Sequence, residues 1–174
     1  MSQKIENLKE FLDSKYLLYN SKSFIEKDPI SIPHLFNRKE DAEIAGFLAA
    51  SLAWGQRVTI INNTRKLMSW MDNAPHDFIC NFKQRDIKPF QKFVHRTFNG
   101  IDCEYFLWSL KNIYQNYGDL ENAFCFADEP SEVLTVKNAI VNFRNVFLKL
   151  DHPVRIEKHI ANPLKKSSAK RLNM

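Results

Sequence analysis

The sequence predicts an all-α fold, a multi-helix bundle packed around one buried central helix. Apolar residues recur every three or four positions in several long stretches, and no stretch alternates convincingly between apolar and polar residues. Residues 37–55 carry apolar or small side chains on most faces of a helix, which is typical of a helix surrounded by others. With 174 residues the chain is long enough for one domain with its own core. We expect no β-sheet.

The predicted central helix covers residues 37–55. Asn37 is placed to cap its first turn, and the acidic residues at positions 40 to 43 lie where the helix dipole favours negative charge. Gly55 is placed to end the helix, because glycine adopts the left-handed conformation without strain. About 13 uncharged residues separate Glu43 from Arg57, against the ~20 that a membrane span needs. We therefore expect a core helix and no membrane span.

The other elements are predicted from periodicity and from helix-breaking residues. Residues 3–19 should form an amphipathic helix that covers the core. Residues 28–34 contain two prolines and should form an extended connector. In the mixed stretch 84–100, Pro89 and Gly100 limit any helix to roughly two turns. Further helices are predicted over residues 57–72, from Pro75 onward, over residues 102–117 with Asp102 as the cap, and over residues 120–126 and 131–150.

The positive charge of the chain is concentrated at its C-terminal end. Residues 155–174 contain six Lys or Arg and one acid, so the rest of the chain holds 19 basic and 19 acidic residues and is neutral. We therefore divide the chain into a helical domain, residues 1–154, and a basic C-terminal segment, residues 155–174. Such a local excess of positive charge indicates contact with a polyanion.

The sequence argues against several kinds of chemistry. No two histidines lie three or four residues apart beside a carboxylate, as a helix-borne metal site requires. The chain has four glycines and no phosphate-binding, dinucleotide-binding or serine-nucleophile motif. We predict no metal and no cofactor. The three cysteines are widely spaced, and the N-terminus has no apolar export signal, so we expect a cytoplasmic protein with reduced thiols.

The basic segment offers candidate phosphate ligands. Small residues between its cations let a phosphate backbone approach closely. The alternative is a solvated basic terminus without a partner, and composition alone does not separate the two. The candidate nucleic-acid-binding residues of this segment are Lys165, Lys166, Ser167, Ser168 and Arg171, with Lys170 between them.

Residues 52–67, LAWGQRVTIINNTRKL, follow an apolar helix, and residues 168–174, SAKRLNM, follow the turn-like stretch PLKKSS. Together they resemble the helix-hairpin-helix DNA glycosylase superfamily, through an uncharacterised bacterial family that carries the string SAKRLNM. The first stretch is similar to the pattern LSAQxTxxVxVNxATxKL of the endonuclease III branch, and the second to the GRKTANV segment that ends the hairpin. The resemblance implies a fold equivalent to the first part of such a glycosylase.

The resemblance also implies roles for individual residues. Gln56 stands where a glutamine at the helix end approaches DNA beside an extruded base. Lys170 stands where bifunctional members hold the lysine that attacks the sugar as a Schiff-base nucleophile. Lys165, Lys166 and Arg171 would bind phosphates while the base is read in a pocket beside the central helix. The family's glycine-rich turn is replaced by the residues before Ala169.

Members of that superfamily continue with a long helix and a segment like PLDTHVHR, whose aspartate assists the chemistry. Because this chain stops at Met174, the resemblance predicts a fragment or truncated product. We therefore expect a DNA-binding protein of a base-excision-repair lineage, a glycosylase or lyase if complete and inactive by itself. The alternative is a non-catalytic helical protein-interaction module. An incompletely covered central helix would also favour self-association through an apolar face.

Overall fold

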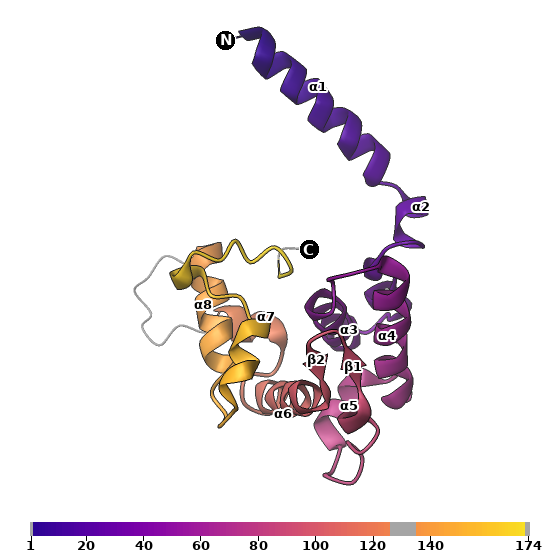
Figure 1. Cartoon of the computed structure of the whole chain (residues 1–174), viewed down its shortest axis with the longest axis vertical. Coiled ribbons are helices and arrows are strands. Elements are labelled where there is room, and N and C mark those ends of the chain that lie inside the picture. The colour runs from indigo at the N-terminus through magenta and orange to yellow at the C-terminus, as the bar shows by residue number, and fades with distance from the viewer. Residues whose placement is uncertain (1, 126–134, 173–174) are drawn as a thin grey trace.

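A computed structural model describes residues 2–125 and 135–172, apart from the side chains of residues 2–6. Helices dominate the described chain, which confirms the all-α class (Figure 1). The prediction of no sheet is wrong in one detail, because β1 (Val94–His95) and β2 (Phe98–Asn99) form a two-stranded antiparallel hairpin. The hairpin is too short to show alternation in the sequence. Its turn depends on Arg96, which adopts a φ of 56°.

The predicted helices after residue 55 are present with shifted ends. Of the helix expected over residues 131–150, residues 131–134 lie outside the described part and the helix ends at Phe147. None of the described helices is both long and apolar enough to cross a membrane. The helices are α1 (Ser2–Tyr19), α2 (Lys22–Ile25), α3 (Lys39–Ser51), α4 (Arg57–Trp70), α5 (Pro75–Asn81), α6 (Gly100–Asn116), α7 (Leu120–Cys125) and α8 (Val136–Phe147), and the 3-10 turns are η1 (Pro29–Ser31), η2 (Pro33–Leu35), η3 (Phe90–Lys92), η4 (Val154–His159) and η5 (Pro163–Lys165).

α1 forms where the periodicity predicts a helix, but it does not cover the core. It projects away from the other helices (Figure 1), and Leu8, Phe11 and Leu12 are each more than half exposed. The helix is present as predicted, but the prediction that its apolar face covers the core is wrong, because periodicity does not identify the surface that such a face would meet.

The connector before α3 is folded into two 3-10 turns, η1 and η2, so the prediction of an extended connector is wrong. Each proline occupies a first turn position, where its missing N–H costs nothing. Asp28 caps η1, because its carboxylate accepts a hydrogen bond of 3.1 Å from the Ile30 amide. The prolines exclude a regular α-helix, as predicted, but they permit these tight turns.

α3 is shorter than the predicted central helix and is not capped by Asn37. Its N-cap position is Arg38, which makes no side-chain capping bond, and the helix ends at Ser51. Gly55 has a φ of 121° but lies in the loop after the helix. Asp41 instead accepts a hydrogen bond of 2.8 Å from the His76 amide at the start of α5. The acidic residues of the first turn thus connect neighbouring helices.

α3 is buried on most of its surface but not on all of it. Ile44, Ala45 and Leu48 are at most 1% exposed. Gly46 and Ala50 are only partly buried, and their face borders a cavity. The expectation that other helices cover every face of α3 is therefore wrong for this small-residue face.

An aromatic cluster joins α3, α6 and α8. The Phe47 ring of α3 lies 5.6 Å from the Phe106 ring of α6 and 5.3 Å from the rings of Phe143 and Phe147 of α8. Such pairs each contribute about 0.5–1.5 kcal/mol beyond the burial of their area. This cluster fixes α8, and with it the chain that follows.

α6 begins directly after the hairpin, and its start differs from the prediction. Asn99, not Asp102, is the N-cap: its side chain accepts from the Ile101 amide at 3.1 Å. Asp102 completes a capping box by accepting from the Asn99 amide at 2.9 Å. Gly100 allows close packing here, because a Cβ at this position would lie 1.9 Å from the carbonyl oxygen of Gln91.

We predict that Gly100→Ala destabilises the protein by about 1–3 kcal/mol, the usual cost of overpacking, because the backbone of η3 must move away. Gly46→Ala is the matched control. Its Cβ would meet Pro33 at an ordinary 3.6 Å, and alanine favours a helix interior by up to about 1 kcal/mol over glycine. Urea unfolding measures both variants. Equal stability of the two would contradict this packing.

Candidate nucleic-acid interface

The described part of the basic segment, residues 155–172, contacts α6 through η4 and α8 through η5, and its end extends from α8 toward α3 (Figure 1). Ile156, Ile160 and Ala169 are each at most 5% exposed. These buried positions alternate with exposed cations, so one side of the segment packs and the other faces solvent. Four side chains, Asp102, Arg144, Arg155 and Arg171, provide the polar contacts that hold it.

Asp102 binds the start of the segment. Its carboxylate is fully buried and accepts two hydrogen bonds from Arg155, at 2.9 Å from Nε and 2.8 Å from Nη2. Arg155 also donates to the carbonyl oxygen of Thr97 at 3.0 Å. This bidentate geometry is the strong form of an ion pair. It connects α6, the hairpin and η4.

His159 lies beside the same carboxylate. Its Nε2 atom is 3.4 Å from the Asp102 carboxylate without forming a hydrogen bond of good geometry. The ring packs edge-to-face against Phe98 at 5.0 Å. Burial lowers the pKa of His159 and outweighs the opposing effect of Asp102, while the Lys158 charge lowers that pKa further. His159 is therefore held as the neutral imidazole near pH 7.

Arg144 of α8 holds the middle of the segment. Its guanidinium donates to the carbonyl oxygens of Glu157 and Ile160 and pairs with the Glu157 carboxylate at 2.8 Å. Arg144 is 8% exposed, although it is charged. It lies four residues after Ile140 and three before Phe147, on the buried face of α8. An arginine within such an apolar stripe is a signal that could have identified this contact from the sequence.

Arg171 connects the end of the segment to α3. Its guanidinium donates to the carbonyl oxygen of Ser51 at 3.2 Å, and its burial lowers its pKa. Ser51 is the last residue of α3, where unpaired carbonyls and the helix dipole favour a cation. Arg171 is thus partly buried and engaged with the protein, unlike the three lysines before it.

The predicted phosphate ligands other than Arg171 lie in one compact turn. Asn162 caps η5 by accepting from the Leu164 amide at 3.0 Å, and its carbonyl accepts from the Ser167 amide at 3.2 Å. Lys166 and Ala169 have positive φ values of 62° and 50°, a backbone conformation that glycine adopts most readily. The turn therefore closes without glycine. Its exposed polar residues are Lys165, Lys166, Ser167, Ser168 and Lys170, and the apolar Leu164 is exposed beside them.

Gln56 lies at the other end of the loop that Arg171 contacts. It is exposed at the N-cap position of α4, five residues after Ser51. Contacts with the hairpin fix this loop: His95 Nε2 lies 3.3 Å from the Trp54 carbonyl oxygen, and the Arg96 guanidinium lies 5.1 Å from the centroid of the Trp54 ring. Sequence reasoning missed His95 and Arg96, because their contacts span about forty residues.

The cavity beside Lys170 contains a carboxylate that is already paired. This cavity of about 410 Å³ is bordered by Ser51, Glu157, His159 and Lys170. The Glu157 carboxylate is the acidic group among its described lining residues, and it is bound by Arg144 at 2.8 Å. To act as the general base that deprotonates Lys170, Glu157 would first have to separate from Arg144.

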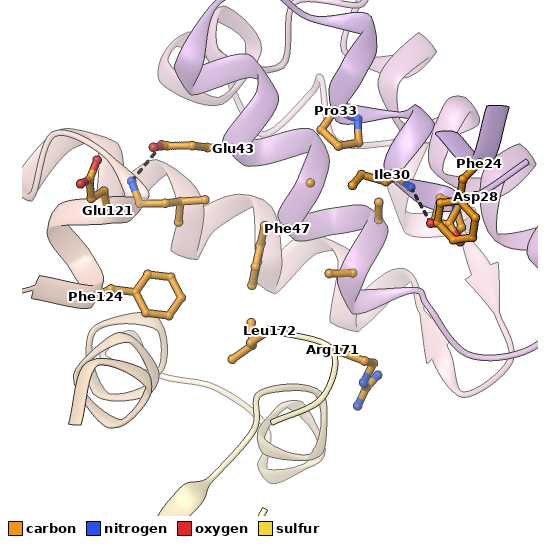
Figure 2. Close-up of a pocket in the computed structure, with 15 residues that line it drawn as sticks. Phe24, Asp28, Ile30, Pro33, Glu43, Phe47, Glu121, Phe124, Arg171 and Leu172 are labelled. Carbon is orange, nitrogen blue, oxygen red and sulfur yellow. Dashed lines mark hydrogen bonds between the residues drawn. The ribbon is translucent and has the colours of Figure 1, made fainter. Parts of the chain in front are cut away.

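A larger cavity of about 670 Å³ opens beside the small-residue face of α3 (Figure 2). Phe47 and Phe124 line it, and Phe124 is stacked on Phe143 at 4.3 Å. Arg171 and Leu172 of the basic segment form part of its border. Glu43 lies at its edge and accepts hydrogen bonds from the Leu120 amide at 3.2 Å and from the Tyr114 hydroxyl at 3.0 Å. The cavity is thus largely apolar with few charged groups at its border.

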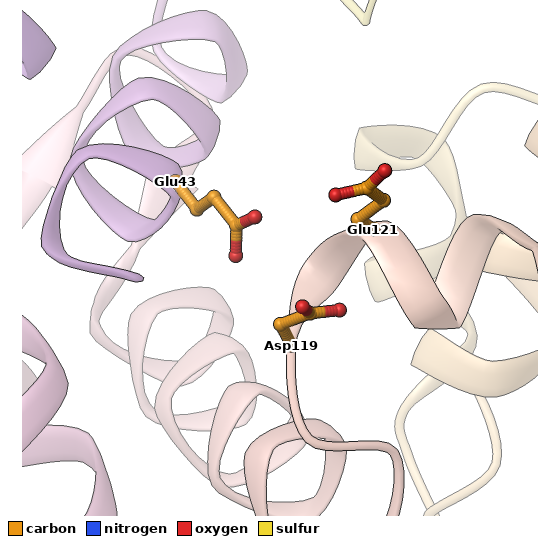
Figure 3. Close-up of side chains that lie close together, drawn as sticks. All are labelled: Glu43, Asp119 and Glu121. Atoms are coloured by element: carbon orange, nitrogen blue, oxygen red, sulfur yellow. The ribbon is translucent and has the colours of Figure 1, made fainter. Parts of the chain in front are cut away.

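Three carboxylates close together form the group that most resembles a cation site. Oxygens of Glu43, Asp119 and Glu121 lie within 4.8 Å of one another (Figure 3). The Lys39 ammonium lies 2.6 Å from Glu121, 3.2 Å from Asp119 and 3.6 Å from Glu43. Its hydrogen bonds to Glu121 and Asp119 raise the pKa of Lys39. The lysine therefore already neutralises this cluster.

The buried state of His159 leads to a prediction about pH. Its pKa is lowered in the folded protein, so the unfolded chain binds more protons as the pH falls below the ordinary histidine value of about 6.5. The free energy of unfolding should therefore fall between pH 7.5 and pH 5.5. His159→Gln should make this dependence weaker, whereas His34→Gln, at an exposed position, should leave it unchanged. Urea unfolding at both pH values provides the measurement, and identical pH dependence of all three proteins would contradict it.

Comparisons with known proteins add a family but no described activity. Residues 28–174 match the family described as "Protein of unknown function (DUF2400)". No curated protein and no solved structure matches the chain. The matched range includes α3, the basic segment and the residues that line both cavities apart from Phe24, but not α1. Because the match covers more than half of the chain, this protein belongs to the DUF2400 family.

Proposed function

We propose that this protein binds duplex DNA through the basic segment, in the manner of a glycosylase-like base-excision-repair lineage, and that it is catalytically inactive in this form. The observation that carries the proposal is that the arginines and the lysines of this region have different surroundings. Arg144, Arg155 and Arg171 are engaged with the protein itself. Lys165, Lys166 and Lys170 are exposed on one fixed turn.

The chemistry of this turn suits a phosphate backbone. Lysine ammonium groups bind phosphate oxygens as point charges, and serine hydroxyls add hydrogen bonds. Ser167 and Ser168 lie between the lysines in the sequence. These serines and Ala169 have small side chains, which lets a phosphate backbone approach closely. Because Arg171 contacts Ser51, the turn is joined to the loop that carries Gln56. In the proposal, Gln56, five residues after Ser51 at the start of α4, contacts a base of the duplex that lies on the turn.

The large cavity supports a further part of the proposal, which is that an extruded base enters it. Its volume of about 670 Å³ is within the usual range for small-molecule sites, roughly 300–1,000 Å³. Phe47 and Phe124 offer apolar faces for a base, and Glu43 offers a carboxylate acceptor for an exocyclic amine. Leu172 and Arg171 border the cavity, so phosphate binding and base binding would take place on adjoining residues.

Salt dependence tests the phosphate contacts. If Lys158, Lys165, Lys166 and Lys170 neutralise four phosphates, the slope of log affinity against log salt concentration on duplex DNA should be about −3.6. Replacing Lys165, Lys166 and Lys170 with glutamine should reduce the magnitude of that slope by about 2.7. The matched control replaces Lys9, Lys15 and Lys22, which removes the same charge from exposed positions of α1 and α2. If both triple variants weaken binding equally, the contact is a non-localised charge effect.

Borohydride trapping on abasic-site duplex DNA tests the chemistry separately. An imine forms only if a lysine loses its proton and attacks the sugar, and the carboxylate that lines the same cavity as Lys170 is paired with Arg144. We therefore expect binding without a trapped adduct. An adduct that disappears in Lys170→Ala but persists in Lys166→Ala would show that the chain is an active lyase and would refute the proposed inactivity.

The second candidate function is a helical protein-interaction module that also self-associates. It is favoured by the apolar side chains of α1, of which Leu8, Phe11 and Leu12 are 54–55% exposed. Burying such a face favours association with a partner or a second copy. Sedimentation at increasing protein concentration should then show association that is insensitive to salt and lost in Phe11→Ser/Leu12→Ser. A monomer at all concentrations would argue against this candidate.

A further inference from the structure

A second basic surface lies at the other end of α4 from Gln56. Trp70 is the last residue of α4, and Lys66 lies one turn before it on the same face. Lys88, Pro89, Gln91 and Lys92 form the opposite wall, and together these six residues line a groove of about 670 Å³. Because α4 has 14 residues with a rise of about 1.5 Å each, roughly 20 Å separates this groove from Gln56.

The wall opposite α4 is built by a three-residue periodicity. Ile87, Phe90 and Phe93 are each at most 1% exposed, which fixes one side of η3 in the core. The residues between them, Lys88, Gln91 and Lys92, are therefore turned outward and are exposed. The lysines thus extend from an anchored backbone.

Trp70 provides a fixed aromatic surface. Its ring meets Phe90 at 5.3 Å and an interplanar angle of 75°, and Phe93 at 6.2 Å and 81°. Trp70 is only partly buried, and the exposed ammonium of Lys66 lies 4.9 Å from its ring centroid. A planar ligand can take the place of this flexible side chain, which leaves the Lys66 charge free to bind another part of that ligand.

The charge of the groove is positive. Three of its six lining residues are lysines and none is acidic. The Glu104 carboxylate does not line the groove; it accepts hydrogen bonds from Gln84 at 3.2 Å and from the lining residue Gln91 at 3.1 Å. The donors of these two bonds are the neutral amides of Gln84 and Gln91 and not the lysines of the groove.

We propose that this groove binds a nucleotide, whose base stacks on Trp70 and whose phosphate is bound by Lys66, Lys88 and Lys92. Base stacking on an aromatic side chain tolerates any base, and ammonium groups supply the counter-charge for the phosphate. The same chemistry is offered by a free mononucleotide and by an unpaired nucleotide of a DNA strand. The groove is separate from the basic segment, so this site does not depend on the proposed function.

The test uses the full chain in which Lys165, Lys166 and Lys170 are glutamine, so that the basic segment contributes little. The probes are a fluorescently labelled ten-nucleotide poly-dA strand and, separately, AMP by calorimetry. Trp70→Leu should weaken binding at least about fivefold, the lower end for loss of one base–aromatic stack. Trp70→Phe should retain most of the affinity because it keeps a ring. Replacing Lys66, Lys88 and Lys92 with glutamine should weaken binding further and make it less sensitive to salt.

The outcomes separate the sources of the ligand. If AMP and the strand both bind and the substitutions weaken both alike, a free nucleotide is sufficient as the ligand. If only the strand binds, the ligand is a nucleotide within an unpaired strand. Both support the site. Binding that depends on the three lysines but is equal in the Trp70→Leu and Trp70→Phe variants would overturn it, as would no binding of either probe. If urea unfolding shows that Trp70→Leu is not folded, tryptophan fluorescence decides: quenching by AMP that is lost in Trp70→Phe supports stacking on Trp70, and quenching that is equal with and without Trp70 overturns it.

Discussion

The buried carboxylate of Asp102 is the contact on which the placement of the basic segment depends. It accepts the Asn99 amide at the start of α6 and both donors of Arg155, and the His159 ring packs beside it. A buried carboxylate is costly unless its oxygens are paired, and the hydrogen bonds from Asn99 and Arg155 provide that pairing. One side chain thereby joins the hairpin, α6 and the first turn of the segment.

After this contact, arginines hold the basic segment against the helices, and its lysines are exposed to solvent. Arg144 and Arg171 bind carbonyl oxygens through planar, always-charged guanidinium groups, which suits partly buried positions. Lys165, Lys166 and Lys170 carry their charge on flexible stems in solvent. Arg144 lies in α8 between Phe143 and Phe147, which belong to the aromatic cluster of α3, α6 and α8. The cluster therefore fixes the helix from which Arg144 extends. The core and the basic surface are therefore parts of one arrangement.

Periodicity predicted the helices because a helix with one buried face carries apolar residues every three or four positions, and this spacing can be recognised within the segment itself. The inward residues Ile60, Thr64 and Met68 of α4 are at most 3% exposed, as their spacing indicates. The exact caps were not predictable in this way: Asn37 and Asp102 were the expected caps, but Asn37 makes no capping bond, and Asn99 caps α6 while Asp102 completes its capping box. The turn of the basic segment relies on positive φ values at Lys166 and Ala169, which a residue type other than glycine does not signal. The contacts of Asp102 and Arg155 span 53 residues and leave no local pattern.

Hydrogen–deuterium exchange of the full chain with and without duplex DNA tests the central claim most directly, because it reports every part of the surface at once. Binding by the basic segment predicts slower exchange of the amides in residues 162–172 and in the loop 52–57, with α1 and α8 unchanged. Protection confined to α1, or no protection in residues 162–172 at a DNA concentration that saturates binding, would contradict the proposal that the fixed turn of lysines is the DNA-binding surface.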